Sequence, residues 1–202
     1  RKALKENRID DDIERGRVEL SLARLLTERM NNEEESCALC SALIEENPEE
    51  MEAYEILEWT FAHKRDYPAL LKLWIKKAEI VQDDTQKQDL LVKIATIQEE
   101  ILHNEEDACE TYRQLLDIDA SNSHAALALE RLLRKLGQFK ELAIFYRQQV
   151  DYAPDDSIRV EYLHKLGLLL ARDLHEIEEA VDVFGNALSI DANSVACKRA
   201  VE

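Results

Sequence analysis

Apolar residues recur along this chain at the three- and four-residue spacing of amphipathic helices. Two successive stripes are Leu22, Leu25, Leu26 and Met30, and then Leu39, Leu43 and Ile44. Short polar joints such as NNEEES and HNEED separate the stripes. Connections this short require consecutive helices to run antiparallel. The pattern therefore predicts an all-α chain built from helical hairpins.

Residues that favour helix starts stand where new stripes begin. Asp83 and Asp155 are good N-cap residues, because a carboxylate accepts hydrogen bonds from the free N–H groups of the first turn and complements the helix dipole. Pro68 suits the first turn of a helix, where its missing N–H has no consequence. We therefore expect helices to begin close to these three positions.

The chain repeats itself with a period of 72 residues. DDIERGRVELSLARLL begins at Asp11, DDTQKQDLLVKIATIQ at Asp83 and DDSIRVEYLHKLGLLL at Asp155. The first two copies stay in register without a gap, with Ala23 on Ala95, Cys37 on Cys109, Glu58 on Glu130, Leu70 on Leu142 and Trp74 on Tyr146. In the third copy, the residues opposite Ala95, Ala108 and Tyr112 are Gly167, Ala180 and Phe184. A period this regular predicts an array of stacked units.

Each period accommodates two hairpins, so we expect a single array over residues 1–202. Its five hairpins are predicted over about 13–50, 51–84, 85–122, 123–156 and 157–194, with the truncated start of a further helix at 195–202. The sequence opens RKALKENRIDDD without an initiator Met, so we expect a piece of a longer polypeptide. Because terminal repeats normally need a polar cap, we also expect self-association through the exposed array ends.

One segment, YLHKLGLLLARDLHEIEEAVDVFGNALSIDAN, carries the clearest family pattern. It combines Leu166 and Gly167 in its first helix with Ala180 and Phe184 in its second. In these residues the chain resembles the tetratricopeptide repeat (TPR) family. The resemblance implies a right-handed α-solenoid of antiparallel hairpins whose concave face is lined by the first helix of each hairpin. Small residues at Gly167 and Ala180 would let two helix backbones cross closely, with the aromatic ring filling the space beside them.

The alternate hairpins, 51–84 and 123–156, depart from the family pattern. Glu58 and Glu130 stand where the family has a small residue, and Leu70 and Leu142 replace the small residue of the second helix. The resemblance nevertheless extends over nearly the whole chain. It specifies the fold class and leaves the subfamily open.

Composition narrows the classes of partner. Of 202 residues only 4 are Gly and 3 are Pro, which suits helices with short connections, and the formal net charge is −17. This charge disfavours a nucleic-acid backbone or an anionic membrane as partner. No apolar run approaches the roughly 18 residues of a membrane span, so we expect no membrane insertion. Residues 123–172 differ from the rest, since they hold 8 basic and 6 acidic side chains.

Cys37 and Cys40 form a C-x-x-C pair, a spacing shared by thiol oxidoreductases and half zinc sites. In the 72-residue register, however, Cys40 falls on Tyr112 and Phe184, an inward-facing packing position. Acidic residues just before the pair would raise a thiol pKa, and no second C-x-x-C or His pair supplies further zinc ligands. We therefore expect buried packing residues, with a redox or metal role as the less favoured alternative. No phosphate-binding loop or catalytic constellation is visible, so we expect no metal, no cofactor and no enzymatic activity.

The surface that the resemblance singles out is the concave groove. The family's groove-facing offsets select His124, Leu127, Arg131, Arg134 and Lys135 in the fourth hairpin, and Glu161, His164, Lys165, Leu168 and Arg172 in the fifth. Our candidate peptide-binding residues are the basic groups of this set, Arg131, Arg134, Lys135, His164, Lys165 and Arg172, with Trp59 as a separate anchor. The alternative is an ordinary solvated helix face. If the groups bind a ligand, charge complementarity predicts an acidic peptide near residues 123–172.

Together these observations predict a non-catalytic scaffold or adaptor that binds a protein or peptide on its concave face. One alternative is a regulatory or targeting repeat segment of a larger enzyme or sensor protein. Another is a thiol redox or metal protein acting through Cys37 and Cys40. We expect a cytoplasmic location.

Overall fold

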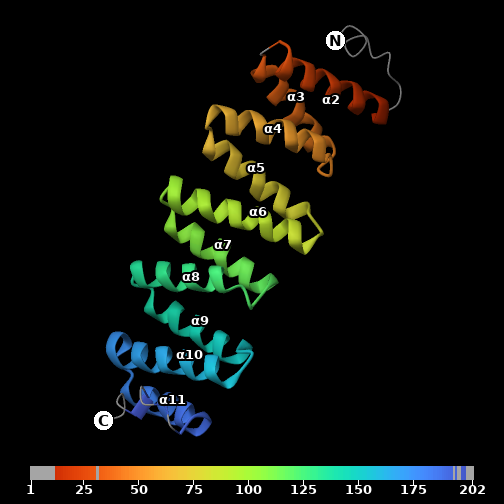
Figure 1. The fold of residues 1–202 in the computed structure, drawn as a ribbon. Coiled ribbons are helices and arrows are strands. Elements are labelled where there is room, and N and C mark those ends of the chain that lie inside the picture. The colour runs from red at the N-terminus through yellow and green to blue at the C-terminus, as the bar shows by residue number, and fades with distance from the viewer. Residues whose placement is uncertain (1–11, 31, 193, 195–196, 199–202) are drawn as a thin grey trace. The chain divides into compact units, whose positions relative to one another are not determined.

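The computed structural model describes residues 12–30, 32–192, 194 and 197–198. It divides into two compact units, Arg1–His103 and Asn104–Glu202 (Figure 1). Throughout the described residues the regular structure is helical and no strand occurs. The predicted all-α fold class of stacked antiparallel hairpins is therefore confirmed.

The first unit is a succession of helices in which each packs against the next. Its elements are α2 (Asp12–Glu28), α3 (Glu33–Glu46), α4 (Met51–Lys64), α5 (Tyr67–Ile80), α6 (Asp84–Thr96) and the π-helix η1 (Ile97–Ile101). The first helices of neighbouring hairpins, α2 and α4, also pack on each other. The core between these helices includes the fully buried Ala23, Cys40, Ala53 and Tyr54.

The second unit follows the same principle. Its elements are α7 (Glu105–Ile118), α8 (Ser123–Lys135), α9 (Phe139–Tyr152), α10 (Asp156–Leu169), the π-helix η2 (Leu170–Leu174) and α11 (Ile177–Ile190). α8 packs on both α7 and α9, and α10 packs on both α9 and α11. Leu115, Leu132, Leu142 and Ala187 are fully buried among these helices.

The structure gives the bounds of the individual helices, and the grouping into five hairpins stays a prediction. The division between the units lies after His103, inside the third predicted hairpin (85–122), so the single continuous array stays a prediction. The helix predicted to begin at 195–202 lies outside the described residues except for Cys197 and Lys198.

Local signals in the sequence have their expected effect at the helix starts. The Asp83 carboxylate accepts a hydrogen bond from the Gln86 N–H at 2.8 Å, and the Asp155 carboxylate accepts one from the Ile158 N–H at 2.9 Å. Pro68 lies in the first turn of α5. These three predictions are confirmed.

Residues with positive φ end the first helix of four hairpins, and they too follow the 72-residue register. Arg65 (φ 56°) corresponds to Gly137 (φ 67°), and His103 (φ 53°) corresponds to His175 (φ 59°). A left-handed residue at a helix end lets the chain reverse while its N–H still bonds a carbonyl of the last turn. Only one of the four positions is a glycine, the residue that adopts this conformation without steric cost.

The small-residue positions of the repeat pattern are close helix crossings, as predicted. A Cβ atom added to Gly167 on α10 would lie 2.6 Å from two ring carbons of Phe184 on α11. Ala180 and Phe184 are each only 2% exposed. The crossing of α10 and α11 therefore has no room for a side chain at Gly167.

Candidate interaction surface

The structure distributes the seven predicted binding residues over both units. Arg131, Arg134 and Lys135 lie on α8, His164 and Lys165 on α10, and Arg172 on η2, all within the second unit. Trp59 lies on α4 of the first unit. The six basic groups therefore belong to one unit and Trp59 to the other.

Two of the predicted cations converge on one glutamate, Glu130 of α8. The Lys165 ammonium lies 3.2 Å from one Glu130 carboxylate oxygen, and Nε of Arg134 lies 3.6 Å from the other. Lys165 also pairs with Glu161 at 3.0 Å. Because the Glu130 side chain is only 18% exposed, solvent screens these pairs less than it screens pairs at an open surface. Part of the positive charge of the predicted groove is thus neutralised within the protein.

Two tyrosines complete this cluster. Nη2 of Arg134 donates a hydrogen bond to the Tyr146 hydroxyl at 2.9 Å, and the guanidinium lies 6.0 Å from the centre of the same ring. The Lys165 ammonium lies 5.1 Å from the centre of the Tyr162 ring, within the range of a cation–π interaction. The two rings are 6.1 Å apart. We call Glu130, Arg134, Tyr146, Tyr162 and Lys165 the Glu130 cluster.

The ionisation of the cluster follows from its burial and its pairs. Burial raises the pKa of Tyr146, and the neighbouring Glu130 raises it further, so the phenol stays protonated. Burial alone would lower the pKa of Arg134 and of Lys165. The hydrogen bond from Arg134 to Tyr146, the one from Lys165 to the Glu161 carboxylate and the charge of Glu130 outweigh this effect and raise both pKa values. Both cations therefore remain charged, and their positions are fixed by several partners at once.

The other basic groups have separate surroundings. Lys135 forms an ion pair with Glu105 of α7. The His164 ring packs at 6.0 Å from the Phe184 ring, so it contributes to the α10–α11 contact. Arg172 is exposed and pairs with no group in the described part of the chain.

The exposed side of α8 carries a hollow of about 550 Å³. Its lining consists of His124, Leu127, Ala128, Glu130, Arg131 and Arg134. Four of the residues that the family offsets assign to the groove are thus brought together at one concave place. Leu127 is 63% exposed there, and two guanidiniums with one carboxylate surround it.

Trp59 is 53% exposed on α4. Its ring stacks on the His63 ring one turn later, with centroids 5.1 Å apart and planes 5° from parallel. In the 72-residue register Trp59 corresponds to Arg131 and His63 to Lys135. The exposed face of α4 therefore presents an aromatic pair where α8 presents two cations.

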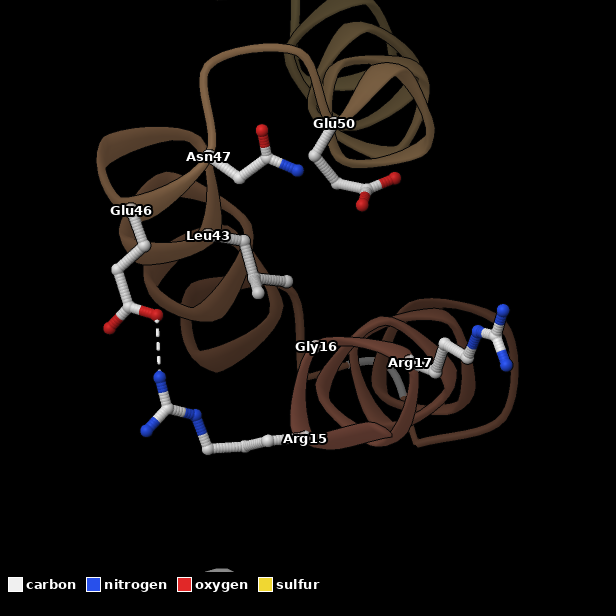
Figure 2. Close-up of a pocket in the computed structure, with 7 residues that line it drawn as sticks. All are labelled: Arg15, Gly16, Arg17, Leu43, Glu46, Asn47 and Glu50. Atoms are coloured by element: carbon white, nitrogen blue, oxygen red, sulfur yellow. Dashed lines mark hydrogen bonds and ion pairs between the residues drawn. The ribbon is translucent and has the colours of Figure 1, made fainter. Parts of the chain in front are cut away.

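A second hollow, of about 470 Å³, opens near the start of the first unit. Figure 2 shows Arg15 of α2 reaching toward Glu46 of α3, with which it pairs at 2.9 Å, while the side chain of Arg17 points away from this pair. The Glu46 side chain is well exposed and the Arg15 side chain is partly exposed, so the pair contributes little to stability. The hollow has no converging set of groups that indicates a ligand.

Of the cysteine pair, Cys40 occupies a buried packing position and Cys37 lies at the edge of the core. Cys40 is fully buried, and burial raises the pKa of its thiol to about 12. Cys37 is half-buried, and burial raises its thiol pKa as well, although the Lys64 charge opposes the rise. The preceding position, Ser36, is fully buried and donates a hydrogen bond to the Ala23 carbonyl at 2.9 Å. Reactive thiols have a lowered pKa, so a redox role for the pair loses support.

The described residues also bear on metal binding and on membrane insertion. They contain no cluster of three or more His, Cys, Asp or Glu side chains that could hold a metal ion. None of their helices is both long enough and apolar enough to cross a membrane.

The chain resembles known proteins in its structure and not in its sequence. No protein-family model matches the sequence, and no curated protein matches it either. The solved structures that it resembles include tetratricopeptide repeat proteins. YrrB, described as a TPR protein with an unusual peptide-binding site, is 18% identical, with 98% of this chain and 95% of YrrB covered and a TM-score of 0.40. A TPR protein of Thermus thermophilus is 15% identical over 91% of this chain and 95% of its own, with a TM-score of 0.36.

A third TPR structure is the C-terminal part of a repeat-containing protein from Cytophaga hutchinsonii. It is 12% identical over 93% of this chain and 73% of its own, with a TM-score of 0.43. Similarity at this level is no basis for carrying a TPR binding site over to this chain, so the function has to follow from its own residues.

The Glu130 cluster is what reasoning from the sequence missed. In the sequence Glu130 is a departure from the TPR pattern, whereas in the structure it is the acceptor for two cations. Its register partner Glu58 likewise pairs with Lys77 at 2.8 Å. The signal in the sequence was an acidic residue at a position that the helical pattern assigns to the inside of the hairpin.

Proposed function

We propose that this chain is a non-catalytic scaffold or adaptor that binds a protein or peptide on the first helices of its hairpins. In the second unit the binding place is the α8 hollow. The observation that carries the proposal is Leu127, a large aliphatic side chain 63% exposed at a concave place with Arg131 and Arg134 beside it. An apolar side chain flanked by fixed donors is the usual composition of a peptide pocket.

The lining of the hollow indicates the kind of peptide. Its lining brings two guanidinium charges and one carboxylate charge together, in a chain that carries −17 as a whole. An aspartate, a glutamate or a chain-terminal carboxylate next to an aliphatic residue fits this lining, since guanidinium groups bind carboxylates through paired hydrogen bonds. Arg134 is already held by Tyr146 and Glu130, so little side-chain entropy is lost when it binds.

The test is selection of peptides from a random linear library displayed on phage, with the immobilised chain as target. We expect enrichment of sequences that combine a carboxylate with an aliphatic residue, and we expect Leu127→Glu to reduce their binding about tenfold or more. This variant suits the fold, because the register partner of Leu127 is Glu55, exposed on α4. Arg134 is left intact because it supports the buried Tyr146.

Val181→Glu is the matched control. Val181 is 49% exposed on α11, so the change adds the same charge at an exposed aliphatic residue outside the hollow. Selected peptides that bind wild type, Leu127→Glu and Val181→Glu equally would refute the assignment of the binding place to α8.

A further inference from the structure

A third hollow, of about 580 Å³, lies between α7 and α9 on the side of the second helices. α8 packs on both of these helices (Figure 1). Leu129 of α8 contributes to the floor of the hollow. Its walls combine polar and apolar side chains, and the apolar ones include Leu116 and Ile118 from α7 and Ile144, Phe145 and Tyr152 from α9. We call this hollow the α7–α9 groove. It shares no α8 surface residue with the hollow around Leu127.

One face of α9 lines the groove in a regular manner. Ile144, Gln148 and Tyr152 follow each other at four-residue spacing, so they share one face of the helix. Ile144 is 49% exposed and Tyr152 is 65% exposed. Two large apolar side chains are thus open to solvent on one stripe of α9, with an amide between them.

The repeat itself shows that the fold does not require these residues. In the 72-residue register, Ile144 and Gln148 correspond to Lys72 and Lys76 on α5 of the first unit. α5 forms the same helix with lysines at both positions. The exposed Ile144 is therefore a particular property of α9 and not a consequence of hairpin packing, whereas Tyr152 corresponds to the apolar Ile80.

The rim of the groove is acidic. Glu110 and Asp117 on α7 and Glu141 on α9 face a single guanidinium, that of Arg113. Arg113 lies between two of them, at 3.4 Å from Glu110 and 3.4 Å from Glu141. Three carboxylates against one cation leave a net negative rim around an apolar floor.

We infer that the α7–α9 groove binds a basic amphipathic helix, either a segment of a partner protein or a peptide. Its apolar stripe would cover Ile144 and Tyr152, and its lysine or arginine side chains would lie against the carboxylates of the rim. Helices bind in such grooves through apolar side chains at three- and four-residue spacing. The charge of the rim, with the net charge of the whole chain, selects a basic helix over an acidic one.

The experiment uses three fluorescent alanine-rich peptides and measures binding to the full chain by anisotropy. The first has leucines on one helical face and lysines on the other, the second has glutamates in place of the lysines, and the third contains the residues of the first in an order without a leucine stripe. We expect the first peptide to bind at least about tenfold more tightly than either of the others. Equal binding of the first and third would mean that only the net charge of the chain attracts them, and equal binding of the first and second would remove the role of the rim. Either result overturns the proposal.

A double variant assigns the site. Ile144→Lys with Gln148→Lys introduces the residues that α5 carries at Lys72 and Lys76, so we expect it to fold and to lose binding of the first peptide by about tenfold or more. Val181→Lys with Asn186→Lys is the matched control, because it adds the same charge at an equally exposed aliphatic residue and an exposed amide on α11. The inference fails if the two double variants weaken binding equally. Leu127→Glu should leave this peptide bound, so the proposed α8 site and this one are tested separately.

Discussion

Gly167 and Gly185, on the two helices that cross at α10 and α11, have opposite surroundings. Gly167 lies on α10, where an added Cβ would approach the Phe184 ring to 2.6 Å, whereas Gly185 lies on α11 with no atom within 4 Å of such a Cβ. Both are inside helices, where replacing Gly by Ala gains about 0.8–1.0 kcal/mol from helix propensity. We predict that Gly185→Ala stabilises the protein and that Gly167→Ala destabilises it.

The size of the destabilisation by Gly167→Ala follows from the overlap of the added Cβ with the Phe184 ring. Carbon atoms pack best at about 3.5–4.0 Å, so a contact of 2.6 Å is about 1 Å too short. Phe184 is 2% exposed and its ring packs against His164, so it cannot move aside into solvent. Overpacking of this kind costs about 1–3 kcal/mol. After the propensity gain, Gly167→Ala should lower the free energy of unfolding by up to about 2 kcal/mol, and the two variants should differ by about 1–3 kcal/mol.

The assay is urea unfolding followed by circular dichroism for wild type and both variants. A third variant, Gly167→Ala with Phe184→Leu, tests the cause. If the ring is what the methyl group meets, the double variant should be more stable than the sum of the single changes predicts. An equal stabilisation by Gly167→Ala and Gly185→Ala would show that α10 and α11 do not cross closely here, and the reasoning would be refuted.

Three further predictions concern turns, charges and pH. His175→Gly should raise the free energy of unfolding by about 0.5–1 kcal/mol and Gly137→Ala should lower it by about 1 kcal/mol, because both positions have positive φ, which glycine adopts without steric cost. Thermal melts in which the two variants do not shift stability in opposite directions would contradict this. Glu130→Gln should lower the free energy of unfolding by about 1–2 kcal/mol and Glu161→Gln by less than about 0.5 kcal/mol. Both carboxylates pair with Lys165, but the Glu130 side chain is 18% exposed and the Glu161 side chain 61%. Urea melts in low and high salt measure both changes, and equal losses would refute the role of burial. Folding raises the pKa of the Cys40 thiol from 9.0 to about 12, so above pH 9 the folded thiol keeps its proton while the unfolded thiol loses it. The free energy of unfolding should therefore fall as pH rises above about 9, by at most about 1.4 kcal/mol per pH unit for this group. A Cys40→Ala variant whose free energy of unfolding falls equally steeply with pH would contradict the assignment.

The sequence was sufficient for the fold because its signals were local and periodic. The 72-residue period, the caps at Asp83 and Asp155 and the small residue at Gly167 each specify a helix or a crossing without reference to distant residues. The π-helical turns η1 and η2 were not predicted, although each is followed within two residues by a histidine with positive φ, His103 or His175, and the period relates these two histidines. A π-helical turn has i→i+5 hydrogen bonds over a single turn, and such a segment is too short for the apolar spacing to identify.

The basic residues predicted for the groove lie on α8, α10 and η2, but their charges were counted as if they were independent. The spacing indicates which face of a helix a lysine occupies, and it does not indicate which carboxylate the ammonium reaches. Lys165 and Arg134 lie against Glu130, so the net charge of the window overstates the charge that is available to a partner. Whether two charges meet across helices depends on differences of a few ångströms that helical periodicity does not determine.

A position-by-position comparison of the repeat copies in the sequence nevertheless indicates some of these ion pairs and hydrogen bonds. Glu58 pairs with Lys77, and the copy of Lys77 is Gln149, so Glu130 has no cation at that place and pairs instead with Lys165 on the next hairpin. Likewise Arg134 and Tyr146 correspond to Ala62 and Trp74. The tyrosine hydroxyl accepts the hydrogen bond of the guanidinium, whereas an indole N–H can only donate, and the copy with the indole has no guanidinium to bind. Two residues that change together between the copies are thus two residues in contact, and the same comparison identified Ile144 and Gln148 as a change that the hairpin does not need.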